Sequence, residues 1–144
     1  MSDRWVTGDH SGSRFPADPT AFLDGGIAFL SDVFQAPVST VTRCEEISGG
    51  STGRKMLLDV EYADVRLDLD SELFVKFSRD FDDPVRDRGR TQMESEVKFA
   101  LLSRTPGFPV VVPRTQFADY HRATGTGILI SQRIAFSVNG IEAQ

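Results

Sequence analysis

The sequence predicts an α+β fold: a five-stranded antiparallel sheet with one packed helix, and an additional helix at the N-terminus. Three observations support this prediction. Three strand-like runs follow one another with short turns between them, which is typical of an antiparallel meander. A capped helix follows over residues 91–103. Two further strand-like runs, 108–117 and 127–136, complete the sheet.

The N-terminal part is expected to contain a flexible arm and one helix. Residues 1–17 are polar and rich in Gly, Ser and Asp, a composition typical of a loose arm. Asp18 and Pro19 then mark a helix start, with Asp as N-cap and Pro in the first turn. Two glycines weaken this helix and Pro37 ends it. Its apolar stripe at helical spacing consists of Leu23, Ile27, Leu30 and Phe34.

Residues 18–144 are predicted to form one lobe around the sheet. Residues 38–47 are rich in β-branched side chains, residues 56–62 alternate apolar and polar side chains, and residues 72–78 form a third strand. The helix over 91–103 begins at a capping box, in which Thr91 and Glu94 satisfy each other's backbone donors. Its predicted apolar face comprises Met93, Val97, Ala100 and Leu101. Residues 119–126 are expected to be the turn between the last two strands.

Composition excludes several classes of function. The formal net charge is −5 and the cations form no block, which disfavours a nucleic-acid partner. One cysteine and two histidines are too few for a disulfide framework or a zinc site. The sequence shows no apolar stretch of membrane-spanning length and no secretory signal. We therefore expect a cytoplasmic protein with no membrane partner.

A glycine-rich turn lies between the first two strands of the meander. Its residues are Gly49, Gly50, Ser51, Thr52 and Gly53. A backbone with few side chains can close over phosphates and present its N–H groups to them. Taken alone, the turn is more simply a flexible β-hairpin connection. The pattern is neither the G-x-G-x-x-G of protein kinases nor a Walker motif.

Lys76 ends the third strand and is a candidate phosphate ligand. Alternation places Phe74 and Lys76 on one face of this strand, and Leu73, Val75 and Phe77 on the other. A cation on an apolar strand requires an anion nearby or must reach water. The alternative interpretation is an edge-strand lysine that discourages aggregation.

The helix offers two carboxylates that could hold this lysine. Glu94 precedes Lys98 by four residues, a favourable spacing for an exposed helical pair, and also serves the capping box. Glu96 lies on the flank of the apolar face, next to Ala100. A carboxylate in that position is better placed to meet a lysine of the sheet, so Glu96 is the predicted partner.

The order of these elements resembles the N-terminal lobe of small-molecule kinases of the aminoglycoside phosphotransferase, choline kinase and ecdysteroid kinase-like family. The resemblance covers residues 38–144. It implies that the glycine loop covers the phosphates of ATP, that Lys76 pairs with them and that Glu96 orients Lys76. It also implies a hinge after the last strand, whose backbone binds adenine at Gln132 and Ile134. Gln132 stands where the family often has an acid.

The resemblance implies an ATP-dependent phosphotransferase acting on a small-molecule hydroxyl, and it ends before the helical C-lobe of such enzymes. That lobe holds the catalytic base, the Mg²⁺ ligands and the acceptor pocket. No catalytic residue is therefore assigned in this chain, and Mg²⁺ is expected only with a C-lobe supplied. We expect a truncated or split form that is inactive alone and that meets a C-lobe or self-associates through an exposed apolar face.

Two other classes of function stay open at the level of sequence. In a non-catalytic binding or interaction module, Lys76 would be structural and the glycine turn would carry no ligand. In an α+β ligand-binding domain unrelated to kinases, no particular contact between Lys76 and Glu96 would be expected. The position of Lys76 relative to the helix therefore discriminates between these interpretations.

Overall fold

A computed structural model describes residues 5–47, 54–64, 69–77, 90–107, 109, 114–121 and 126–133 of the 144-residue chain. The α+β fold class predicted from sequence is confirmed. One sheet has five strands in the order β3-β4-β5-β7-β6, and all its neighbouring strands are antiparallel. Its strands are β3 (Val38–Ile47), β4 (Arg54–Tyr62), β5 (Glu72–Phe77), β6 (Thr115–His121) and β7 (Thr126–Gln132).

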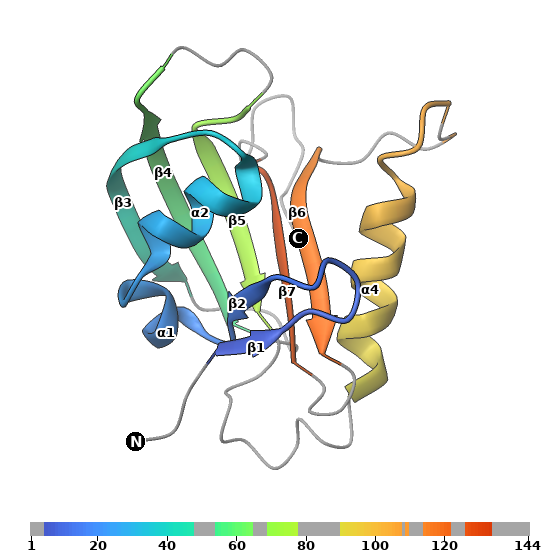
Figure 1. The fold of residues 1–144 in the computed structure, drawn as a ribbon. Helices are drawn as coiled ribbons and strands as arrows, with labels where there is room; N and C mark the ends of the chain where they lie inside the picture. The colour runs from blue at the N-terminus through green and yellow to red at the C-terminus, as the bar shows by residue number, and fades with distance from the viewer. Residues whose placement is uncertain are drawn as a thin grey trace.

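The N-terminal residues form a layer over one face of this sheet (Figure 1). The layer contains a two-stranded hairpin, β1 (Trp5–Thr7) with β2 (Arg14–Pro16), followed by helices α1 (Pro19–Leu23) and α2 (Gly26–Phe34). The expectation of a loose arm over 1–17 is wrong for its described part. Phe15 and Ala17 are fully buried, so the end of this segment belongs to the core despite the polar average composition of the whole.

The predicted N-terminal helix is divided into two. Asp18 caps α1 as expected, since its side chain accepts a hydrogen bond from the Ala21 N–H at 2.9 Å. Gly25 has a φ of 109°, in the left-handed region, and this conformation ends the first helix and begins the second. The break rotates the expected stripe, so that Leu23 and Ile27 are 73% and 43% exposed.

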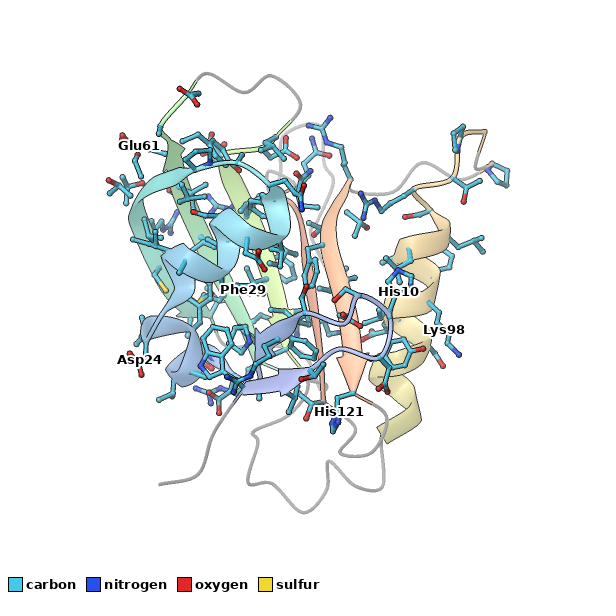
Figure 2. The ribbon with its side chains drawn as sticks, in the orientation of Figure 1. His10, Asp24, Phe29, Glu61, Lys98 and His121 are labelled. Carbon is cyan, nitrogen blue, oxygen red and sulfur yellow. The ribbon has the colours of Figure 1, made fainter. Side chains whose placement is uncertain are left out.

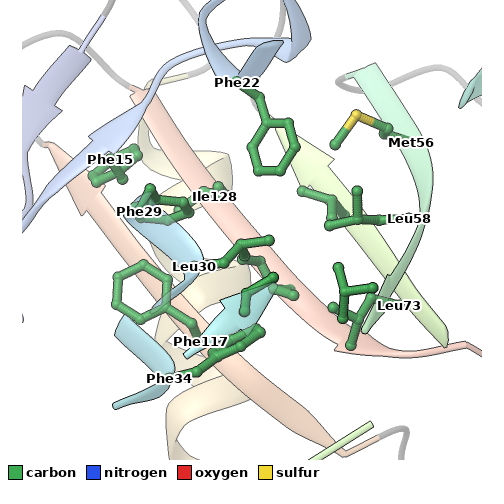
Figure 3. Packing of buried hydrophobic residues seen from close by; sticks show 14 of the residues in the cluster. Phe15, Phe22, Phe29, Leu30, Phe34, Met56, Leu58, Leu73, Phe117 and Ile128 are labelled. Carbon is green, nitrogen blue, oxygen red and sulfur yellow. The ribbon is translucent and has the colours of Figure 1, made fainter. Parts of the chain in front are cut away.

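The main core lies between the N-terminal layer and the sheet (Figure 3). Phe29 is at its centre: its ring meets Trp5 at 5.8 Å and Phe117 at 5.7 Å between ring centroids, both edge-to-face. The strands contribute the residues of one alternating set. Those fully or almost fully buried are Met56, Leu58, Val60, Leu73, Val75, Phe77, Ile128 and Ile130.

Helix α4 (Arg90–Leu102) packs on the opposite face, against β6 and β7. Val97 and Ala100 are buried there with Ala118, and Tyr120 and Leu129 pack around them. This confirms the predicted face of the helix for the side chains that the structure describes. The predicted turn over 119–126 begins too early, because β6 continues to His121.

Asp119 connects the N-terminal hairpin to β6, which is an edge strand. Its fully buried carboxylate accepts hydrogen bonds from the backbone N–H groups of His10 (3.0 Å), Ser11 (3.0 Å) and Tyr120 (2.8 Å), and from the Ser11 hydroxyl. Gly8 leaves room for this carboxylate, since a Cβ there would lie 1.8 Å from Asp119 Oδ2. The hairpin loop therefore covers the exposed edge of the sheet.

Asp119→Asn is expected to lower the free energy of unfolding by about 2 kcal/mol. The carboxylate accepts hydrogen bonds from three backbone N–H groups, and the amide nitrogen of asparagine cannot accept such a bond. Urea unfolding measures this change. Asp24→Asn is the matched control, since Asp24 lies on the exposed end of α1 (Figure 2). Equal stability of the two variants would contradict a role for Asp119 in holding the hairpin.

Candidate functional site

The face of the sheet opposite the main core carries the candidate site. In an antiparallel sheet, side chains of directly paired residues point to the same face. The pairing across β3, β4, β5 and β7 therefore aligns side chains in rows. Three successive rows differ in chemistry: the first holds Lys55 and Lys76, the second holds Leu57 and Phe74 between the polar residues Glu45 and Ser131, and the third holds ion pairs.

The first row brings Lys76 to Glu96, as the sequence predicts. Lys76 Nζ donates to Glu96 Oε1 at 2.7 Å, and the two side chains are 15% and 36% exposed. β5 is the central strand of the sheet, so the interpretation of Lys76 as an edge-strand lysine is wrong. A lysine this far from water needs an anion to offset its desolvation, and Glu96 supplies it.

Packing of α4 sets the position of Glu96. Val97 is fully buried against the sheet, and Ala100 lies one turn beyond Glu96. Glu96 is therefore held at the side of the buried helix face that borders β5 and β7, with its carboxylate over the sheet. Lys98 projects from the same helix (Figure 2). Its ammonium lies over the Tyr120 ring, 5.7 Å from the ring centroid.

The second row lies next to the lysine, two residues farther along each strand. Leu57 and Phe74 are direct partners on β4 and β5, and Ser131 pairs with Phe74 from β7. Leu57 and Phe74 are only half-buried, unlike their neighbours that face the main core. Leu57 and Phe74 thus form an apolar surface on the face of Lys76. This surface lies two residues, or about 7 Å, away along the strands.

The third row is organised by Arg133, to which the sequence analysis assigns no role. Its Nη2 donates to the Leu58 carbonyl (3.0 Å), the Leu73 carbonyl (3.1 Å) and Asp59 Oδ1 (2.5 Å). The guanidinium thereby joins β4 and β5 to the residue that directly follows β7. In the sequence, the only indication of this role is that an arginine directly follows an apolar strand. Its carbonyl partners depend on the order of strands in the sheet, which local sequence patterns do not determine.

Gln132, predicted to contact adenine through its backbone, has a more restricted role. Its N–H donates to the Arg114 carbonyl at 2.8 Å, and its side-chain oxygen accepts from the Arg114 N–H at 3.2 Å. The Gln132 N–H is therefore already used within the sheet. Ile134 and the whole glycine turn, from Gly49 to Gly53, lie outside the described residues.

The hairpin that carries the glycine turn is braced on the core-facing side. Arg54 forms a two-pronged pair with Glu46, at 2.6 Å from Nε to Oε2 and 2.7 Å from Nη2 to Oε1. The Arg54 guanidinium lowers the pKa of Glu46 from its usual value of 4.5. This pair joins the two strands immediately before and after residues 48–53.

The described part of the chain contains no group of three or more His, Cys, Asp or Glu side chains that could hold a metal ion. None of its helices is both long and apolar enough to span a membrane. Chemically, the site offers the ammonium of Lys76 held by Glu96, the apolar surface of Leu57 and Phe74, and the end of β7 that Arg133 bonds to β4 and β5. Such an arrangement can bind an anion attached to a flat apolar group.

Comparison of this chain with models of protein families, with curated proteins and with solved structures gave no match.

Glu46→Gln is expected to remove a stability contribution that depends on pH. A carboxyl whose pKa is lowered in the folded state stabilises the protein above its unfolded pKa, and this contribution is lost as pH falls through the folded value. The difference in urea midpoint between the two proteins should therefore be complete at pH 7, begin to fall near pH 4.5 and be lost at pH values below the lowered folded pKa of Glu46. Glu61→Gln, at an exposed position (Figure 2), is the control. A difference that persists unchanged in acid would contradict the assignment.

Proposed function

We propose that this chain is the nucleotide-binding lobe of an ATP-dependent phosphotransferase that acts on a small-molecule hydroxyl. The ion pair between Lys76 and Glu96, at 2.7 Å, is the observation that carries the proposal. A lysine that pairs with phosphates must keep its ammonium in one place while the ligand arrives. Glu96 does this from a separate element, so the lysine is positioned before binding.

The energetics of this pair favour a functional role. A partly desolvated ion pair contributes little net stability, and apolar side chains in its place are often as stable or more so. The central strand of a sheet is a costly location for such a pair. Phosphate binding gives a reason for its presence, because the ammonium can contact Glu96 and a phosphate oxygen simultaneously through separate N–H donors.

The second row supports a nucleoside as the rest of the ligand. Leu57 and Phe74 provide an apolar and an aromatic surface on the same face as Lys76, and a purine base binds well to such a surface. The β7 strand end beside them is braced by Arg133. Its backbone is therefore a rigid candidate for the hinge that contacts adenine.

Phosphoryl transfer needs more than this lobe is proposed to supply. It requires a group that orients the attacking hydroxyl and carboxylates that hold Mg²⁺. The proposal for the described residues is therefore limited to nucleotide binding, and ATP affinity is the property that tests it.

Lys76→Ala is expected to weaken binding of dye-labelled ATP on the order of tenfold, because a charge-assisted contact to phosphate is lost. Fluorescence titration without Mg²⁺ measures the affinity. Lys98→Ala is the control, since Lys98 projects from α4 over the Tyr120 ring of β6 and does not belong to the row of the sheet that contains Lys76. A wild-type protein that binds no ATP, or equal losses in both variants, would favour the non-catalytic binding module instead.

A further inference from the structure

A second lysine stands directly opposite Lys76. Lys55 on β4 is the Cα partner of Lys76 on β5, so both side chains lie on the face that carries Glu96. Both residues are half-buried. Lys55 follows closely after residues 48–53, so the cation pair stands at the end of the sheet from which the glycine turn departs.

Resting on the function proposed above, we propose that Lys55 is a second phosphate ligand, and that Lys55 and Lys76 together bind the polyphosphate chain of a nucleoside triphosphate. Paired residues on neighbouring antiparallel strands have Cα atoms about 5 Å apart. Two long side chains from such positions can reach different phosphate groups of one chain. A monophosphate offers a single group and gains little from the second lysine.

The charge of the row supports this assignment. Like charges directly opposite one another on a sheet are unfavourable, and an anion bound between the two ammonium groups would relieve that repulsion. Glu96 is an ion-pair partner of Lys76. A phosphate chain that contacts both lysines adds negative charge to the row that they share.

Its neighbour Arg54 has a different role. Strand alternation directs Arg54 to the core-facing side, where it forms its two-pronged pair with Glu46. Lys55 is therefore the residue of this pair that the register places on the ligand side. Of these two neighbouring cations, Arg54 therefore stabilises the hairpin and Lys55 is proposed to bind the ligand.

The test compares Lys55→Gln with Lys98→Gln in calorimetric titrations of ATP, AMP and inorganic tripolyphosphate, all without Mg²⁺. Glutamine keeps the polarity and most of the length of the side chain but removes its charge. Lys55→Gln is expected to weaken ATP and tripolyphosphate binding on the order of tenfold and AMP binding by less than about twofold. Lys98→Gln is expected to leave all three affinities at the wild-type value. Unfolding midpoints of both variants establish that they are folded.

The outcomes separate this inference from the proposed function. ATP binding that depends on Lys76 but is unchanged in Lys55→Gln would overturn the role of Lys55 and leave the nucleotide site standing. Tripolyphosphate binding that depends on Lys55, without any preference for ATP, would support the two-lysine site and contradict the nucleotide function. Binding of neither ligand by the wild-type protein would overturn both.

Discussion

The ion pair between Lys76 and Glu96 is the interaction on which this interpretation depends, and it requires a sheet with two different faces. The N-terminal layer buries most side chains of β4, β5 and β7 on one face, with Phe15 and Phe29 among its core residues. In the described part of the chain, helix α4 packs on the β6 and β7 part of the other face. Lys76, Leu57 and Phe74 on that face are half-buried, so an ammonium can be partly desolvated there and still be reached by a ligand.

Because side chains alternate between the two faces of the sheet, every second residue along β4 and β5 lies on the face of Lys76, and the chemistry of these residues changes along the strands. Moving away from the glycine turn, the open face changes from lysines to Leu57 and Phe74, and then to the network around Arg133. Each step is two residues, about 7 Å. A nucleoside triphosphate has the same gradient, from charged phosphates to an apolar base, and the match gives the proposed ligand a single direction of binding.

The sequence predicted these features where local patterns were decisive. Period-two alternation placed Lys76 and Phe74 on one face, and helical geometry selected Glu96 over Glu94 as its partner; the contact at 2.7 Å confirms that selection. Asp18 was also recognised as a helix cap. Features that depend on distant contacts were missed. The polar segment around Ser11 is ordered by Asp119, more than one hundred residues later in sequence, and Arg133 finds its carbonyl partners on two other strands.

A double-mutant cycle on nucleotide affinity tests the central claim, that Glu96 acts on the ligand by positioning Lys76. The affinity for ATP is measured for the wild-type chain, Lys76→Ala, Glu96→Ala and the double variant. If Glu96 positions Lys76, Glu96→Ala should weaken ATP binding when Lys76 is present and change it little when Lys76 is already alanine. Losses that simply add, or a wild-type protein without measurable ATP affinity, would contradict it.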